Sequence, residues 1–150
     1  MLVVDANVLL HAVNADAAEH ETSRRWLEYR LSSAEPVGFA WIALLAFVRI
    51  GTRAGVLPSP MSVGEAFDHV EDWLVQPSAV VLQPSPRHAA LLRGLLEPLG
   101  VAGNLASDAH LAALALEHGA TVCTFDRDFA RFPGVHWRHP LDDLSRERLI

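Results

Sequence analysis

Short segments that are apolar along most of their length alternate with helix-forming segments. They read LVVD (2–5), PVGFA (36–40), AVVLQ (79–83) and ATVCTF (120–125), with GVHW (134–137) as a weaker fifth. A strand without polar alternation needs cover on both faces, which is typical of a parallel sheet between helices. The sequence therefore predicts an α/β fold with a mostly parallel central sheet of about five strands.

Helix signals lie between these segments. Asp16 is positioned to cap a helix through residues 17–31, and residues 41–53 form a strongly apolar helix. Ser62 and Glu65 have the Ser-x-x-Glu spacing of a capping box, in which each side chain accepts a bond from the other's backbone. A further helix is predicted near residues 107–118, directly before the fourth strand.

Length and composition limit the class of protein. The chain has 150 residues, of which 51% are hydrophobic and 20% charged, as expected for one globular domain over residues 1–150. Polar residues interrupt every apolar run before it could span a bilayer, and the N-terminus lacks the basic start of a signal peptide. A lone Cys123 cannot form an internal disulfide. We therefore expect a cytoplasmic protein without a membrane segment.

The charge is acidic overall, with a formal net charge of −6. This balance argues against broad electrostatic adhesion to nucleic acid, although a local arginine face remains compatible with it. All 12 basic residues are arginine, so a mechanism that needs lysine is excluded. Any contact with a phosphate group would use guanidinium groups, which bind phosphate oxygens in pairs.

Acidic residues follow two of the predicted strands. Asp5 ends the first strand, Asp126 ends the fourth, and Asp108 lies in the first turn of the helix that leads into the fourth. In an open parallel sheet all three positions lie at the carboxyl edge, where ligands bind. Asp128 lies just beyond it. Each aspartate alone could cap a helix, but together they favour a shared site for Mg²⁺ or Mn²⁺, which prefer oxygen ligands.

Polar neighbours could complete this site. Asn7 could orient a carboxylate or form a local turn, and Thr124 could hydrogen-bond a carboxylate or simply suit a strand. Ser107 is equally suited to cap its helix or to support the site. Arg49, and Arg53 four residues later, could reach a phosphate or be solvated at the end of their helix.

Three stretches together resemble PIN domains, and in particular the VapC-type toxins of bacterial toxin–antitoxin pairs. They are VVDANVLLHA (3–12), AFVRIGTR (46–53) and the segment from Asn104 to Trp137 with its Thr-x-Asp-x-Asp-Phe motif. The resemblance implies a three-layer α/β/α fold and a Mg²⁺-dependent endoribonuclease, in which Mn²⁺ can substitute. It also implies an RNA substrate, a VapB-like antitoxin and a homodimer.

Carried over to this chain, the family's first acid matches Asp5 and its third matches Asp108. Its fourth matches either Asp126 or Asp128. The second acid, usually a glutamate, is replaced by Ala46. Three explanations are open: three aspartates and water suffice for one ion, Asp128 substitutes for the missing ligand, or metal affinity is poor and the protein is weakly active. The alternative function is a degenerate PIN domain that binds RNA or a partner without efficient cleavage.

Two further hypotheses concern the chemistry and the partners. A phosphoryl-transfer domain with an aspartate nucleophile is disfavoured, because the chain has no lysine and the first strand ends in Asp-Ala-Asn.

The apolar run from Phe39 to Val48 exceeds what one buried helix face requires. It could be a core helix, a homodimer seam or an antitoxin groove.

Overall fold

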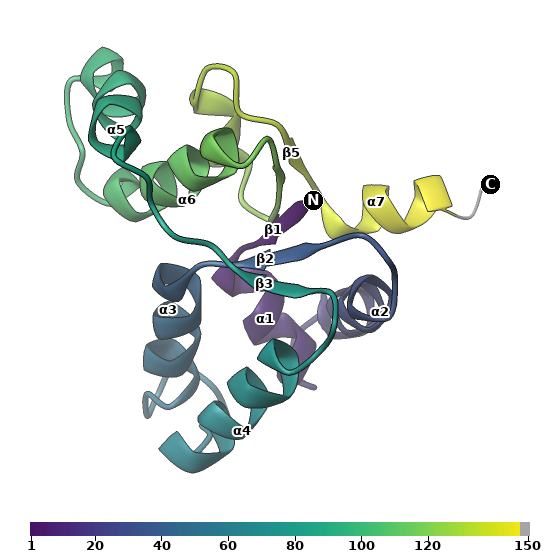
Figure 1. The fold of residues 1–150 in the computed structure, drawn as a ribbon. Helices are drawn as coiled ribbons and strands as arrows, with labels where there is room; N and C mark the ends of the chain where they lie inside the picture. Colours follow the sequence, from purple (N-terminus) through teal and green to yellow (C-terminus); the bar gives the residue numbers. More distant parts are fainter. Residues whose placement is uncertain (148–150) are drawn as a thin grey trace.

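Five parallel strands form the central sheet of the computed structural model, which describes residues 1–147 (Figure 1). The sheet order is β3-β2-β1-β4-β5, and every neighbouring pair is parallel. The strands are β1 (Leu2–Val4), β2 (Val37–Phe39), β3 (Ala79–Val81), β4 (Thr121–Cys123) and β5 (Trp137–Arg138). The predicted sheet is confirmed.

Helices connect the strands and flank them. The α-helices are α1 (Ala6–Val13), α2 (His20–Leu31), α3 (Trp41–Gly51), α4 (Val63–Leu74), α5 (His88–Leu96), α6 (Leu105–Glu117) and α7 (Pro140–Glu147). Two 3₁₀-helices are also present, η1 (Glu97–Leu99) and η2 (Arg127–Arg131). None of the helices in residues 1–147 combines the length and the apolar character needed to cross a membrane.

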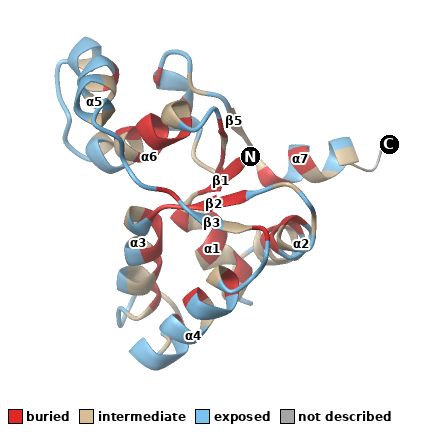
Figure 2. Cartoon of the chain, viewed as in Figure 1, coloured by how far each residue is buried: buried red, intermediate tan, exposed pale blue. Residues whose placement is uncertain are grey.

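Two apolar layers cover the two faces of the sheet. Leu2 and Val4 of β1 point into a core shared with helices α1 to α4, whereas Val3 points into a second core built on α6. This alternation follows from the two-residue repeat of a strand. Figure 2 shows buried residues on the inner strands of the sheet, β1, β2 and β4, and on the helix faces toward the sheet, whereas the edge strands β3 and β5 have none. The expected three-layer α/β/α arrangement is therefore confirmed.

Local helix signals were only partly reliable. The capping box of Ser62 and Glu65 is present, with both reciprocal hydrogen bonds. Asp16, in contrast, does not cap α2, because residues 15–19 form turns and a bend and the helix begins only at His20. Ser107 is not an N-cap either, since α6 already begins at Leu105.

The C-terminal helix α7, which the sequence patterns did not predict, is attached by a buried charge network. Asp143 is 1% exposed and accepts hydrogen bonds from Trp26 Nε1 at 2.7 Å and from Arg30 Nε and Nη2 at 2.9 and 2.6 Å. Its other oxygen accepts a bond from Arg138 Nη1 at 3.2 Å. One carboxylate thus joins α2, β5 and α7.

Removing this carboxylate should strongly destabilise the fold. In Asp143→Ala, Arg30 keeps Glu35 and Glu147 as partners but loses its most buried counter-charge. We expect a loss of roughly 3 kcal/mol in the free energy of unfolding, as for other broken buried pairs. Urea denaturation measures it. The exposed Asp68→Asn on α4 serves as control, and equal stability of the two variants would contradict the role given to Asp143.

Candidate active site

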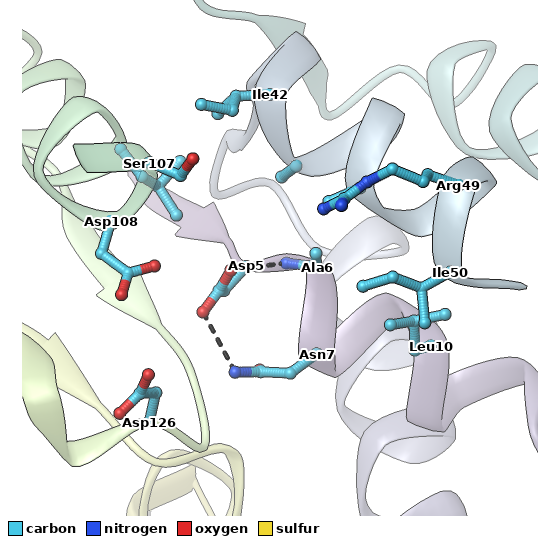
Figure 3. A pocket seen from close by; sticks show the side chains of 13 residues that line it. Asp5, Ala6, Asn7, Leu10, Ile42, Arg49, Ile50, Ser107, Asp108 and Asp126 are labelled. Atoms are coloured by element: carbon cyan, nitrogen blue, oxygen red, sulfur yellow. Dashed lines mark hydrogen bonds between the residues drawn. The ribbon is translucent and has the colours of Figure 1, made fainter. Parts of the chain in front are cut away.

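Three aspartates from distant parts of the chain line one pocket at the carboxyl edge of the sheet (Figure 3). Asp5 follows β1, Asp126 follows β4 and Asp108 lies in the first turn of α6. The pocket has a volume of about 250 Å³. The structure therefore brings together the three acids that the sequence placed at one edge.

Asp5 is held in place by the backbone and by two side chains. Its N–H donates to the Cys123 carbonyl at 3.1 Å, which extends the pairing of β1 with β4. Its Oδ1 accepts from Ala6 N at 2.7 Å and so caps α1. Its Oδ2 accepts from Asn7 Nδ2 at 3.0 Å and from Thr124 Oγ1 at 2.7 Å. The Asp5 carboxylate therefore caps helix α1 and lines the pocket at the same time.

Thr124 links the two strand ends. Its side chain is fully buried, and its hydroxyl donates to Asp5 while accepting from Asp126 N at 2.9 Å. Asn7 Nδ2 also donates to this hydroxyl at 3.0 Å, and Asn7 Oδ1 accepts from Phe125 N at 3.2 Å. Both residues therefore position carboxylates.

Asp126 and Asp128 occupy different places. Asp126 lines the pocket, and its Oδ1 accepts from Asp128 N at 2.8 Å, which caps η2. Asp128 is exposed and is not part of the pocket wall, although its charge reaches Asp108. Of the two, Asp126 has the geometry of a site residue.

The shared pocket perturbs the acids. Burial and, to a lesser extent, the negative charges of Asp5, Asp126 and Asp128 together raise the pKa of Asp108 to about 6. Burial also raises the pKa of Asp5, against the lowering effect of its hydrogen bonds to Thr124, Ala6 and Asn7. A cation in this pocket would offset the repulsion that the carboxylates exert on one another.

Helix α3 forms the opposite wall. Ala46 lines the pocket, so the position of the family's second acid does face the three aspartates. Arg49 lies one turn further on and directs its guanidinium group into the pocket (Figure 3). Arg53 lies beyond the end of α3 and is not part of the wall.

Several wall residues were not singled out in the sequence as site residues. Leu10, Ile42 and Ile50 provide apolar surface, whereas Ser107 of α6, which the sequence did suggest as a supporting residue, contributes a hydroxyl. Ile42, Ala46 and Arg49 are spaced i, i+4 and i+7, so they share one helix face. That spacing was visible in the sequence and could have identified Ile42.

The carboxylate oxygens of the pocket suit a hard divalent cation that keeps part of its water shell. Within residues 1–147, no three Asp, Glu, His or Cys side chains stand close enough to bind one ion directly. Mg²⁺ usually takes only one or two carboxylates and keeps several waters, and Mn²⁺ also favours oxygen ligands. Oxygen-only donors with unbalanced negative charge therefore fit such an ion.

Sequence comparison identifies the family. The model of the PIN domain matches residues 2–135. Ribonuclease VapC37 of Mycobacterium tuberculosis is 51% identical over 140 residues, covering 93% of this chain and 97% of the relative. VapC ribonuclease Mb2897 of Mycobacterium bovis is 43% identical over 142 residues, covering 95% and 97%.

Solved structures show the same fold at lower identity. VapBC2 from Rickettsia felis, bound to a DNA fragment of its promoter, matches with a TM-score of 0.67 and 17% identity, covering 92% of this chain and 97% of the matched one. VapC20 of M. tuberculosis, a sarcin–ricin loop cleaving toxin, matches with a TM-score of 0.64 and 19% identity, covering 91% and 99%. The chain therefore belongs to the PIN-domain family, as a member of its group of VapC ribonucleases.

Proposed function

We propose that this protein is a Mg²⁺-dependent endoribonuclease and the toxin of a VapBC-type toxin–antitoxin pair. The proposal is carried by one observation: Asp5, Asp108 and Asp126 face a common pocket in a chain of the VapC group. It is supported by the raised pKa of Asp108, which marks negative charge that a cation would balance.

The residues would divide the work as follows. Asp5, Asp108 and Asp126 would hold Mg²⁺, or Mn²⁺ in its place, in part through bound water. Such an ion, when bound, lowers the pKa of a water and offsets charge on the scissile phosphate. Asn7 and Thr124 fix Asp5, and Arg49 can hold a phosphate oxygen. Among the described residues, no histidine or glutamate lines the pocket as a general base.

Partners follow from the same proposal. The substrate is RNA and the inhibitor is a VapB-like antitoxin; VapBC complexes are among the structural relatives. Both interactions would take place in the cytoplasm. A homodimer is supported by the free edge of the sheet, where Val80 and Val81 of β3 are 39% and 36% exposed. An exposed apolar edge strand is a natural site for self-association.

The alternative function is a PIN domain that binds RNA or a partner without efficient cleavage. Ala46 favours it, since the pocket lacks a carboxylate at that point and the described wall offers no other acid besides the three aspartates. The coordination of Mg²⁺ argues against this alternative, because Mg²⁺ needs only one or two protein carboxylates and takes its other ligands from water.

Asparagine substitutions separate the two functions. With Mg²⁺, we expect Asp5→Asn, Asp108→Asn and Asp126→Asn each to lower kcat/KM for RNA by about 100-fold or more, since they remove charge at the ion. Asp128→Asn should lower kcat/KM less than these substitutions do, and Asp68→Asn should leave kcat/KM unchanged. The measurement is cleavage of labelled RNA, repeated with EDTA. If wild type and Asp5→Asn cleave RNA at equal rates and EDTA does not inhibit either, the proposed nuclease function is wrong.

Thr124 should act as a positioning residue through its hydroxyl. We expect Thr124→Val, which keeps the shape, to lower cleavage by about 10- to 100-fold, because Asp5 and Asp126 lose their common link. Thr124→Ser keeps the hydroxyl and should restore most of the activity. Cleavage assays at varied Mg²⁺ test this, and the expected defect is a higher Mg²⁺ requirement. Equal rates for the valine and serine variants would show that the hydroxyl is not needed.

The raised pKa of Asp108 should also be visible in stability. Its folded pKa, about 6, lies above the ordinary 3.8, so the stabilising effect of its proton is complete below pH 4 and is lost as the pH rises through 6. In EDTA, Asp108→Asn should therefore be more stable than wild type at pH 7.5, by on the order of 1 kcal/mol after allowance for solvent screening of a half-buried group. The difference should shrink at pH 4.5. Urea unfolding at both pH values measures it, and a constant difference would contradict the assignment.

A further inference from the structure

Four side chains form a hydrogen-bonded chain where helix α5 meets helix α6. Ser85 precedes α5 and His88 begins it, whereas His110 and Glu117 lie two turns apart on one face of α6. His88 Nδ1 lies 2.9 Å from Glu117 Oε2, and His88 Nε2 lies 2.8 Å from His110 Nδ1. None of the four lines the acidic pocket, so this cluster is a separate feature of the described chain.

Glu117 fixes the orientation of the His88 ring. The Glu117 side chain is only 4% exposed, and its Oε1 accepts hydrogen bonds from Ser85 N at 3.1 Å and from Ser85 Oγ. Burial raises the pKa of Glu117, but the hydrogen bonds from Ser85 and His88 outweigh it and lower the pKa below its ordinary value. The ionised carboxylate can only accept, so His88 Nδ1 carries a proton.

The protonated Nδ1 leaves a lone pair on the other nitrogen of His88. A neutral imidazole carries one proton, so Nε2 of His88 is an acceptor directed at Nδ1 of His110. His110 can donate its proton into this lone pair, and a metal ion can take the place of that proton. The order carboxylate, histidine, cation is the one in which an outer carboxylate fixes the tautomer of a metal-binding histidine and raises its basicity.

We propose that His88 and His110 bind a transition-metal ion between α5 and α6, with Zn²⁺ as the ion that fits. Imidazole nitrogen suits Zn²⁺, whereas Mg²⁺ prefers the oxygen ligands of the acidic pocket. Two Zn–N bonds of about 2.0–2.1 Å at a tetrahedral angle need the nitrogens about 3.3 Å apart, so from 2.8 Å the rings must separate by about 0.5 Å. Water supplies the remaining ligands, because no third Asp, Glu, His or Cys side chain in residues 1–147 reaches the same point.

Such an ion would fasten a weakly attached helix. Helix α5 packs on α6, which lies between it and the sheet (Figure 1), and Leu95 is the one buried residue of α5. His110 follows Asp108 by two residues on α6, so one helix connects the histidine pair with the acidic pocket. A bound ion would therefore stabilise the helix pair that presents Asp108. The inference does not depend on the proposed nuclease function.

Titration calorimetry with Zn²⁺ at pH 7.5 tests the site, in an excess of Mg²⁺ that competes for the acidic pocket. At this pH an imidazole with the ordinary pKa of about 6.5 is neutral and can bind a metal. We expect wild type to bind one ion per chain, and His88→Gln and His110→Gln each to lose this binding. Glu117→Gln keeps both histidines and should bind about 10-fold more weakly, because it alters the outer partner of His88.

Two control variants should bind Zn²⁺ as wild type does. Asp126→Asn removes a charge from the acidic pocket, and His136→Gln removes an exposed histidine outside the cluster. Circular dichroism shows whether each variant is folded. Anomalous diffraction at the zinc edge from soaked wild-type crystals does not depend on any variant, and we expect a peak between His88 Nε2 and His110 Nδ1.

Four results would overturn the inference. They are no saturable Zn²⁺ binding by wild type, undiminished binding by a folded histidine variant, an anomalous peak elsewhere, and loss of binding in Asp126→Asn, which would assign the ion to the acidic pocket. Unchanged affinity of Glu117→Gln would contradict the role given to that carboxylate.

Discussion

Carboxylates that share a partly buried pocket repel one another, and a fold can hold them there only if other interactions compensate. In this protein the compensation comes from the covalent and hydrogen-bonded frame of the sheet. Asp5 and Asp126 extend from adjacent parallel strands, and Thr124 bonds to both. Asp108 accepts no such hydrogen bond within residues 1–147, and burial, together with the charges of the other aspartates, raises its pKa to about 6. The remaining repulsion is the free energy that a bound cation would recover.

The wall facing these acids determines what else the site can bind. Helix α3 follows β2 directly, with Ala43, Leu44 and Phe47 in the core. Its other faces line the pocket or contact solvent. The apolar run from Phe39 to Val48 therefore forms a helix that is buried in the core on one side and exposed on the other. Its exposed side continues the acidic pocket, and Ala46 makes that continuation apolar.

Sequence patterns predicted the features that depend on local chemistry. Uniformly apolar strands, the Ser62–Glu65 capping box and the placement of acids at strand ends all follow from short-range rules. The patterns failed where contacts between residues distant in the sequence determine the structure. Helix α7 depends on Asp143 meeting Trp26, 117 positions away, and the choice between Asp126 and Asp128 depends on how η2 turns. The Asp5–Asn7–Thr124 network could be suggested from sequence, but its hydrogen bonds required the fold.

The central claim is that these aspartates form one cation site. Anomalous diffraction from crystals soaked in Mn²⁺ tests it most directly. We expect a peak in the pocket, within bonding distance of at least one of Asp5, Asp108 and Asp126 and close enough to the others for bridging water. A peak elsewhere, or none at a Mn²⁺ concentration that supports RNA cleavage, would contradict it.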